Sequence, residues 1–557
     1  MSPAATLPES LDLGHHLNKR IRNVQPSAMK AMGALLANKN LLSLGGGTPH
    51  PSLFPMSHTT FTLPTLQSLN GNIDDWRAGV APTEEVHLKK TGPGTEMDEG
   101  GVLDLNVILQ YGLSNGYKEL VEKLEQINLL LHGKTISDAS IYVTLGNTDG
   151  VSKAFQLLVE PDVDTVLTEE YSFSSSLNSA RAKGAKLYPI KVDADGLDPE
   201  DLENVLSGWD EVAQGRKPHL LYTIPCGQRY EAIYAIAQKH DVIIIEDDPY
   251  FPLQFTAYQS DATERADNLK AARAKLASPP AKAQDDDPAA VAKVFNDYAG
   301  VKSFLSRDVD GRVLRIDTFS KVFGPGVRLG WISANSLFVE RLLRIGGELH
   351  CDGSWLIGLE TTTQIPNGFS QAVLASYLSD KHWGIGGFIR WMWGVRLEYQ
   401  QKRDFFLDKF AEYVPSEFVT TVPCGAGMFQ WLKVDLTSHL RYIRTPIQTP
   451  APVDLTSDTV GQEPVIPPGL QVKVPGNGGG TRYTTNTAEL MDELWNYLVQ
   501  EGGVLVLPAK SFLVPKPGAD QTEGFNFFRA TFAGDHEGID KALAAFGVGI
   551  KKWFERG

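Results

Sequence analysis

Residues 312–334 read "RVLRIDTFSKVFGPGVRLGWISA", and this stretch gives the strongest signal in the sequence. An apolar run of strand character ends near Thr318, Lys321 follows beside a Gly-Pro-Gly turn, and a second apolar run begins at Leu329. A lysine in this place can form a Schiff base if neighbouring cations keep its amine partly neutral, and Arg328 offers a planar fork for a phosphate. A Ser-Lys pair alone is more often a solvated loop, so other parts of the chain must support the chemical interpretation.

Short apolar runs alternate with helical patterns around this stretch. The alternation predicts an α/β fold, with a mostly parallel sheet flanked by helices on both faces. Ligands of such sheets bind at the carboxyl ends of the strands, so polar residues just after each run are the candidates for a site. The expected strands lie near 141–145, 164–169, 185–192, 219–224, 241–247, 312–319 and 329–334, and the expected helices near 149–159, 173–183, 198–206 and 229–239.

The pattern also predicts the domain organisation. We expect a large domain over residues 105–395, a smaller α+β domain over 396–557, and an N-terminal arm over 1–60 that contributes to the small domain and the active site. Segment 259–300 is rich in Ala, Lys and Asp, and segment 445–485 is rich in Pro, Thr and Gly. Such compositions predict mobile surface insertions that pack no core and carry no chemistry.

Composition excludes several classes of function. The 557 residues carry a net charge of −15, which disfavours nucleic acid and anionic membrane as partners. No apolar run approaches the length of a membrane span, and the first residues lack the apolar core of a signal peptide. The three cysteines, Cys226, Cys351 and Cys424, are scattered and in no metal-binding spacing, so we expect a cytoplasmic protein without a metal site.

Polar residues follow three of the other expected strands. In "IIIEDDPYF", Asp247 ends a buried apolar run and Tyr250 follows it, although an Asp-Pro turn is the commoner meaning of such a stretch. In "TLGNTDG", residues 144–150, a strand passes through a glycine into a helix, and amides at a helix N-terminus bind phosphate without a charged side chain. Tyr171 in "TEEYSF" is an aromatic residue at a strand end, which taken alone indicates core packing.

With these pieces in order, the chain resembles the fold-type I pyridoxal-phosphate (PLP) enzymes. Within them it is most similar to the fungal aromatic amino acid and 2-aminoadipate aminotransferases, which are relatives of kynurenine aminotransferase. The resemblance rests on the pattern S-K-x-x-x-P-G-x-R-x-G at Lys321 and covers roughly residues 15–555 outside the two insertions. It also includes "LLSLGGGTPHPSLFP", "LQYGLSNGYKELVEKL", "IIIEDDPYF", "GFSQAV" and "FFRATFAG".

The resemblance implies a role for each matching residue. Lys321 holds PLP covalently and shuttles the proton at the substrate carbon, Asp247 meets the ring nitrogen, and Tyr250 meets the phenolic oxygen. Tyr171 stacks on the ring, and Arg529 grips the substrate carboxylate from the C-terminal domain. The remaining implied contacts are Asn147, Thr148, Thr318 and Arg328 to the phosphate, Gly47 and Lys30 to the substrate, and Tyr111 to the phosphate of the other subunit of a homodimer.

The chain departs from the family pattern at two places. Relatives continue "T-x-P-x-G-Q" with "N-P-T-G" and further residues before the next helix, whereas this chain passes from Gln228 directly to Arg229. The asparagine that hydrogen-bonds the PLP phenolic oxygen and the N-cap of the helix are therefore both missing. Residues 346–359, "GGELHCDGSWLIGL", form an apolar insert that relatives lack. One explanation for both is an incorrectly assigned gene sequence, with one exon edge trimmed and one intron retained.

The sequence therefore predicts PLP-dependent transamination of aromatic amino acids, with 2-aminoadipate or kynurenine as further donors and a 2-oxo acid such as 2-oxoglutarate as acceptor. A catalytically impaired PLP-binding homologue is the alternative that the missing loop leaves open. A PLP-sensing regulator of DNA would need a helix-turn-helix module, and we expect none before "LLSLGGG" in this acidic chain.

Overall fold

The computed structural model describes residues 7–24, 49–71, 73–91, 104–110, 115–225, 229–300, 302–345, 366–446, 483–516 and 524–556. The chain divides into two compact units, and each is treated by itself below. The larger unit comprises Met1–Phe405 and Pro423–Met428, and the smaller unit comprises Phe406–Val422 and Phe429–Gly557. The larger unit thus extends past residue 395, where the sequence placed the boundary. Among the described residues, no helix has both the length and the apolar character that crossing a membrane requires.

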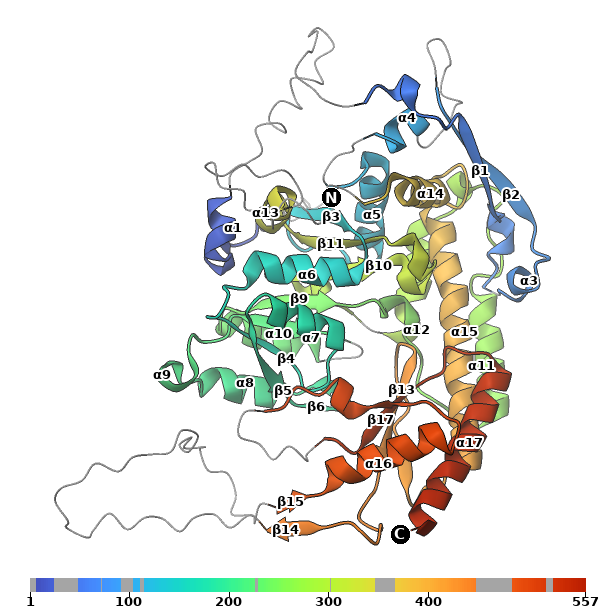
Figure 1. Ribbon diagram of the computed structural model, residues 1–557. Helices are drawn as coiled ribbons and strands as arrows, with labels where there is room; N and C mark the ends of the chain where they lie inside the picture. The colour runs from blue at the N-terminus through green and yellow to red at the C-terminus, as the bar shows by residue number, and fades with distance from the viewer. Residues whose placement is uncertain are drawn as a thin grey trace, which may run out of the picture. The chain divides into compact units, whose positions relative to one another are not determined.

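A seven-stranded sheet forms the centre of the larger unit (Figure 1). Its strands follow the order β3-β11-β10-β9-β8-β4-β5, and only β11 runs antiparallel to its neighbours. The predicted α/β fold with a mostly parallel sheet is therefore confirmed. The bounds are β3 (Ala139–Thr144), β4 (Thr165–Glu169), β5 (Lys186–Ile190), β8 (Leu220–Thr223), β9 (Ile243–Asp247), β10 (Val313–Thr318) and β11 (Gly330–Asn335).

Apolar side chains cover both faces of this sheet. On β9, Ile243 and Ile245 pack into one cluster with Phe155 of α6, whereas Ile244 points to the opposite face and packs with Ile233 of α10. Successive residues of a strand point to opposite faces, so a strand buried on both sides reads as a continuous apolar run. The helices of these two clusters are α1 (Lys19–Asn23), α6 (Asn147–Leu158), α7 (Ser174–Ala182) and α13 (Ser336–Ile345) on one side, and α8 (Pro199–Ser207) and α10 (Tyr230–Lys239) on the other.

Segment 259–300 differs from its prediction. It contains two helices, α11 (Ala262–Ala274) and α12 (Pro288–Ala299), which begin at the side-chain caps Asp261 and Asp287. On α12, Val291 and Phe295 are buried in the main apolar cluster of the unit. The expectation that this segment packs no core is therefore wrong, because an i, i+4 apolar pair gives even an Ala- and Asp-rich helix one face to bury.

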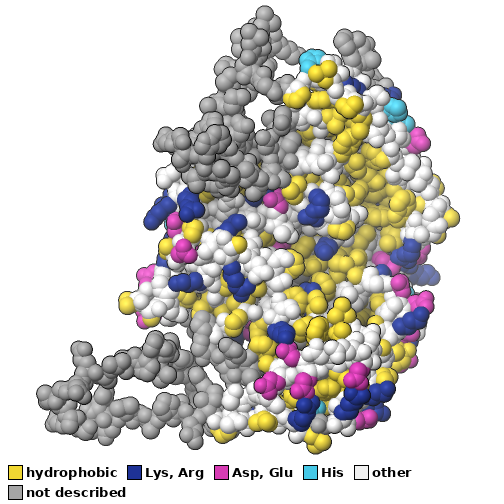
Figure 2. Space-filling view, viewed as in Figure 1, with side chains coloured by type: hydrophobic (Ala, Val, Ile, Leu, Met, Phe, Trp, Pro, Cys, Tyr) yellow, Lys and Arg dark blue, Asp and Glu magenta, His cyan; other side chains and the backbone are white. Residues whose placement is uncertain are grey.

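The same cluster includes a hairpin and several long helices. The elements are the antiparallel pair β1 (His58–Pro64) and β2 (Thr83–Lys89), together with α5 (Lys118–His132), α14 (Gly368–Leu378) and α15 (Gly384–Tyr413). Shorter elements of the unit are α3 (Asp74–Arg77), α4 (Leu105–Ile108), α9 (Glu211–Gln214), β6 (Val192–Asp193) and β7 (Gly196–Leu197). Figure 2 shows hydrophobic side chains gathered on the face that lies over α14 and α15.

The smaller unit is an α+β arrangement, as the sequence predicts. Its antiparallel sheet has the order β12-β13-β17-β16. The elements are β12 (Val419–Thr421), β13 (Phe429–Val434), β16 (Leu507–Pro508), β17 (Phe527–Thr531), α16 (Thr487–Gln500) and α17 (His536–Arg556). A separate pair, β14 (Arg444–Pro446) and β15 (Tyr483–Thr485), flanks the 445–485 segment, most of which lies outside the described residues.

Candidate active site

The candidate residues of the larger unit follow strands that end at one edge of its sheet. β3 runs in the same direction as β10 because β11 lies antiparallel between them, and β4, β8 and β9 share that direction. In the register, Ile316 pairs with Asp247, and Gly330 pairs with both Thr318 and Thr144. Residues that follow these strand ends are therefore neighbours in space. They are Asn147 and Thr148 after β3, Tyr171 after β4, Tyr250 after β9, and Lys321 after β10.

Lys321 ends a short 3-10 turn, η7 (Phe319–Lys321), directly after β10. Thr318 fixes the start of this turn, because its Oγ1 accepts from the Ser320 amide at 3.1 Å and lies 2.8 Å from the Ser320 hydroxyl. The Lys321 Nζ lies 5.8 Å from the centre of the Tyr250 ring. The structure therefore brings the lysine of the motif to the tyrosine of "DDPY", two residues far apart in the sequence.

A glycine and an arginine lie together at the start of α6. The N-cap Gly146 has φ 108° and no side-chain cap, so the first amides of α6 have no partner within the helix. Arg328, in a left-handed conformation with φ 48°, directs its guanidinium at this glycine. A Cβ at Gly146 would lie 3.0 Å from Arg328 Nη2, so any larger residue would fill the space. Helix amides and a guanidinium are the kinds of donor that can bind a phosphate, and Thr148 stands in the same first turn.

The carboxylate of Asp247 is buried and oriented by two side chains. Asn147 Nδ2 donates to Oδ1 at 2.5 Å, and the Tyr222 hydroxyl donates to Oδ2 at 2.7 Å. Burial raises the pKa of Asp247, while the hydrogen bonds from Tyr222 and Asn147 oppose that rise. The Asn147 side chain, expected at the phosphate, is thus turned toward the aspartate. Burial makes the ionised form of a carboxylate unfavourable, and a cation in contact with it stabilises that form.

Behind Asp247 lies an ionic cluster that the sequence reading did not anticipate. Arg315 of β10 is fully buried, and its Nε and Nη2 donate to the two oxygens of Asp317 at 2.9 and 2.8 Å. Its Nη1 lies 3.0 Å from Glu246 Oε1 and 3.4 Å from Asp248 Oδ2. One guanidinium therefore serves several carboxylates, and burial raises the pKa of Asp248 to about 8. Charged residues inside otherwise apolar strands, as in "IIIEDD" and "VLRID", are the signal that could have revealed it.

Tyr171 lies just past the end of β4 and is half-buried. Burial raises the pKa of its hydroxyl, so the ring remains a neutral phenol at physiological pH. The adjacent strand end is held by Glu169, whose Oε1 accepts from the Thr223 hydroxyl at 2.5 Å and from the Ile224 amide at 3.1 Å. β4 and β8 therefore end together at the edge that contains Asp247.

Arg529 belongs to the smaller unit, on β17 between β13 and β16. Its guanidinium lies 3.9 Å from the centre of the Phe429 ring and 4.0 Å from that of Phe512, so aromatic rings hold it in place. The residue also borders an apolar cavity within this unit, whose walls include Leu432 and Phe546. The structure thus offers a positioned cation in the smaller unit.

Several sequence-predicted features lie outside the described residues. They are Lys30, Gly47, Tyr111, Gln228 and the insert 346–359. After residues 226–228, the description resumes at Arg229. Helix α10 begins at Tyr230, and its N-cap Arg229 makes no side-chain capping bond, as expected. Arg229 instead pairs with Asp193 at 2.6 Å and with Asp195 at 3.3 Å.

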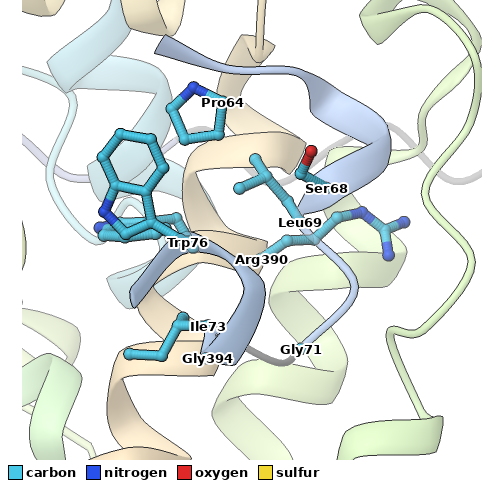
Figure 3. Close-up of a pocket in the computed structure, with 9 residues that line it drawn as sticks. Pro64, Ser68, Leu69, Gly71, Ile73, Trp76, Arg390 and Gly394 are labelled. Atoms are coloured by element: carbon cyan, nitrogen blue, oxygen red, sulfur yellow. The ribbon is translucent and has the colours of Figure 1, made fainter. Parts of the chain in front are cut away.

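A cavity of the larger unit lies between the segment after β1 and helix α15 (Figure 3). Leu69, Ile73 and Trp76 contribute apolar groups to it. Arg390 is its charged group, and this side chain is paired with Asp286 at 2.9 Å. Because the charged group of this cavity is already paired, we assign the candidate chemistry to the edge of the sheet that contains Lys321.

Comparisons with known proteins agree with this geometry. A family model described as "Aminotransferase class I and II" matches residues 94–546. The chain is 33% identical to an L-tyrosine:2-oxoglutarate aminotransferase of Tapinella panuoides, over 98% of this chain and 97% of that protein. It is 34% identical to an aromatic amino acid aminotransferase of Schizosaccharomyces pombe, over 77% and 83%. The crystal structure of aminotransferase Aro8 from Candida albicans matches with a TM-score of 0.76 and 28% identity, over 98% and 100%.

Proposed function

The chain belongs to the class I and II aminotransferase family, and from this premise we propose that it is a PLP-dependent aminotransferase of aromatic amino acids. It takes the amino group of an aromatic amino acid and passes it to a 2-oxo acid such as 2-oxoglutarate. The tyrosine and aromatic amino acid aminotransferases among its relatives support this substrate class. One observation carries the proposal: Lys321 Nζ meets the Tyr250 ring at the sheet edge where the buried Asp247 also lies.

The residues at this edge fit PLP. The space at Gly146, which a Cβ would fill, suits the phosphate, with the α6 amides and Arg328 as its donors. The buried Asp247 suits a protonated ring nitrogen, because the positive charge there offsets the cost of ionising the Asp247 carboxylate. Tyr171, half-buried just after β4, would cover the ring, and Thr318 holds the turn of Lys321. When bound, PLP supplies the electron sink that makes the substrate Cα acidic.

The side chains divide the remaining work. We assign to Lys321 Nζ both the covalent attachment of PLP and the transfer of the proton at the substrate Cα. With PLP bound, the Tyr250 hydroxyl would donate to the phenolic oxygen, and Asp247 would keep the ring nitrogen protonated. Arg529 binds the substrate α-carboxylate, for which a guanidinium gives a bidentate grip. We also propose that Gly47 and Lys30 contact the substrate.

We further propose a homodimer in the cytoplasm, in which Tyr111 reaches the phosphate site of the partner subunit. Figure 2 shows hydrophobic side chains on the face over α14 and α15, and we take this face as the one that a second copy covers. Size-exclusion chromatography with light scattering tests the dimer. A monomeric mass for the active protein would contradict it.

The uncapped start of α10 favours one second candidate, an impaired PLP-binding homologue. Arg229 gives the helix no side-chain cap, and the sequence lacks the asparagine-bearing turn of the relatives. Such a protein would hold PLP and transaminate slowly.

A coupled assay separates the two candidates. The PLP-loaded chain is mixed with L-tyrosine and 2-oxoglutarate, glutamate formation is followed, and Lys321→Ala serves as the inactive control. We expect tyrosine-dependent glutamate formation that Lys321→Ala abolishes. PLP binding with turnover that is slow or absent would favour the impaired homologue, and a chain that neither binds PLP nor turns over would refute both.

A further inference from the structure

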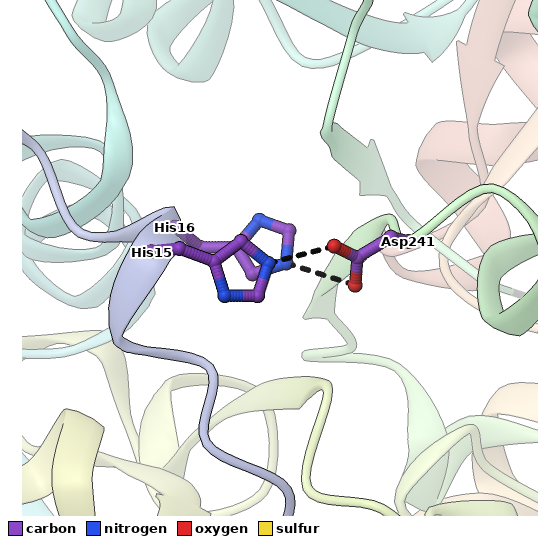
Figure 4. Close-up of side chains that lie close together, drawn as sticks. All are labelled: His15, His16 and Asp241. Atoms are coloured by element: carbon purple, nitrogen blue, oxygen red, sulfur yellow. Dashed lines mark hydrogen bonds and ion pairs between the residues drawn. The ribbon is translucent and has the colours of Figure 1, made fainter.

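Two adjacent histidines meet an aspartate at the opposite edge of the same sheet (Figure 4). His15 and His16 belong to the short turn η1 (Gly14–His16), and Asp241 lies just before β9. His15 Nε2 lies 2.7 Å from Asp241 Oδ2, and His16 Nε2 lies 3.1 Å from Asp241 Oδ1. In Figure 4 both imidazole rings face the carboxylate. This is the amino-terminal edge of the parallel strands, so the cluster is separate from the edge of Lys321.

A buried polar chain continues inward from His16. Its Nδ1 lies 2.9 Å from Nδ1 of His219, which precedes β8, and His219 Nε2 lies 3.1 Å from Oδ2 of Asp164, which precedes β4. The His16 and His219 rings are stacked, with centroids 5.1 Å apart. Asp164 also pairs with Arg216 at 3.1 Å. The order of contacts is thus Asp164, His219, His16, Asp241.

The number of hydrogens available to this row of four side chains shows that it lacks one. Each of its three contacts requires one hydrogen, the two ionised carboxylates carry none, and two neutral imidazoles carry one each. Two hydrogens cannot serve three contacts. Either a third proton makes one of the buried rings a cation, or a metal cation replaces the hydrogen at one contact.

The contact between His16 and Asp241 is the one that suits a metal. With a cation there, His16 Nδ1 donates to His219 Nδ1 and His219 Nε2 donates to Asp164, so all remaining contacts are satisfied. A metal-binding histidine characteristically donates its other ring nitrogen to an acceptor that fixes its orientation. The Asp241 end of this row of side chains is also open to solvent. The side chains of His15 and Asp241 are 54% and 52% exposed, while that of His16 is 1% exposed.

Neighbouring charges are compatible with a cation. Arg312 Nη1 approaches Asp241 Oδ1 at 3.6 Å, but the guanidinium charge is directed at Asp310, which accepts from Nε at 3.0 Å and from Nη2 at 2.9 Å. The carboxylates of Asp241 and Asp164 lie at the two ends of the histidine pair. The cluster therefore carries negative charge that a divalent ion would balance.

We infer that His15, His16 and Asp241 bind a divalent zinc-class cation, with His219 and Asp164 as the groups that orient His16. The three ligand atoms already lie within 4.8 Å of one another. Zinc binds imidazole nitrogen and carboxylate oxygen at about 2.0–2.2 Å, so a small rotation of the exposed His15 ring closes the site. Three protein ligands leave a fourth position for water. The cation would clamp the N-terminal segment to the sheet and so stabilise the fold.

Zinc uptake by the full chain tests this inference. The protein, first treated with a chelator, is dialysed against ZnCl2, the bound metal is measured, and the midpoint of thermal unfolding is recorded with and without zinc. We expect one zinc per chain and a higher midpoint with zinc. His15→Ala and Asp241→Asn should each weaken uptake at least about tenfold, since even changes around a metal ligand cost about 10- to 100-fold in affinity. Asn suits position 241, whose φ of 52° favours Asp and Asn.

His87→Ala is the matched control, because His87 is another exposed histidine beside a carboxylate, 3.5 Å from Glu85. This variant should bind zinc like the parent chain. Failure of the parent to take up zinc would leave a third proton as the occupant and overturn the inference. Equal uptake by Asp241→Asn, His15→Ala and the parent would overturn it as well, since the zinc would then lie elsewhere.

Discussion

Replacing Tyr222 with Phe removes the hydroxyl that donates to Asp247 in the proposed active site and that also has a hydrogen bond with Ser176. The tyrosine is fully buried on β8, and its ring packs on Phe155 with centroids 5.7 Å apart. Its hydroxyl donates to Asp247 Oδ2 at 2.7 Å. Phenylalanine keeps the ring and its packing, so Tyr222→Phe isolates the contribution of the hydroxyl to the state of Asp247.

The structure sets the size of the effect. A hydrogen bond to an ionised group contributes about 1.5–3 kcal/mol, so the free energy of unfolding should fall by that amount where Asp247 is ionised. The bond favours the ionised carboxylate, and its loss therefore raises the pKa of Asp247 above the level that burial already imposes. The stability difference should shrink as the pH falls through that pKa, because the protonated carboxyl needs the donor less. At the transition state the same loss predicts a decrease of about tenfold to a hundredfold in kcat/KM.

The assay combines urea unfolding at several pH values with the pH profile of kcat/KM for L-tyrosine. Tyr234→Phe is the matched control, since this buried hydroxyl lies 2.5 Å from Asp310 Oδ1 and 3.0 Å from Asp308 Oδ1, near the start of β10. Both variants should lose stability, and only Tyr222→Phe should move the acid limb of the activity profile to higher pH. An unmoved limb in Tyr222→Phe, or the same movement in Tyr234→Phe, would refute the assignment of Asp247.

Four further predictions concern other parts of the chain. Burial raises the pKa of Asp248 from 3.8 to about 8, so the free energy of unfolding should fall as the pH rises between these values. Asp248→Asn should flatten that fall in urea titrations, and an unchanged slope would contradict it. Phe295→Ala should cost about 3–5 kcal/mol of stability, against almost none for the exposed control Asp297→Ala. Arg529→Ala should lower kcat/KM about tenfold to a hundredfold, and unchanged kinetics would remove it from the site. Inserting "NPTG" after Gln228 should raise PLP affinity and turnover roughly fivefold to a hundredfold, and equal activity of the short form would make that asparagine dispensable.

Local patterns were enough to predict the sheet and the residues at its edge. Apolar runs bounded by Gly and Pro predicted the strands, and the rule that ligands bind at carboxyl ends directed attention to Lys321, Asp247 and Tyr250. The strand order is not sequential, since β11 lies between β3 and β10. The hydrogen bond from Tyr222 to Asp247 depends on β8 lying beside β9, and no local pattern predicts it.

Two failures have different physical causes. The composition of segment 259–300 hides its two helices, although the caps Asp261 and Asp287 and the apolar pair on α12 are present in the sequence. The Arg315 cluster and the contacts of His16 could not be found in that way, because each joins residues that only the folded sheet brings together.

The covalent attachment of PLP at Lys321 is the most direct test of the proposed function. The protein is incubated with PLP, reduced with borohydride, digested and mapped by mass spectrometry. The account predicts a pyridoxyl group on the peptide that contains Lys321 and none on the same peptide of Lys321→Ala. A label on another lysine, or no label on a folded protein, would contradict it.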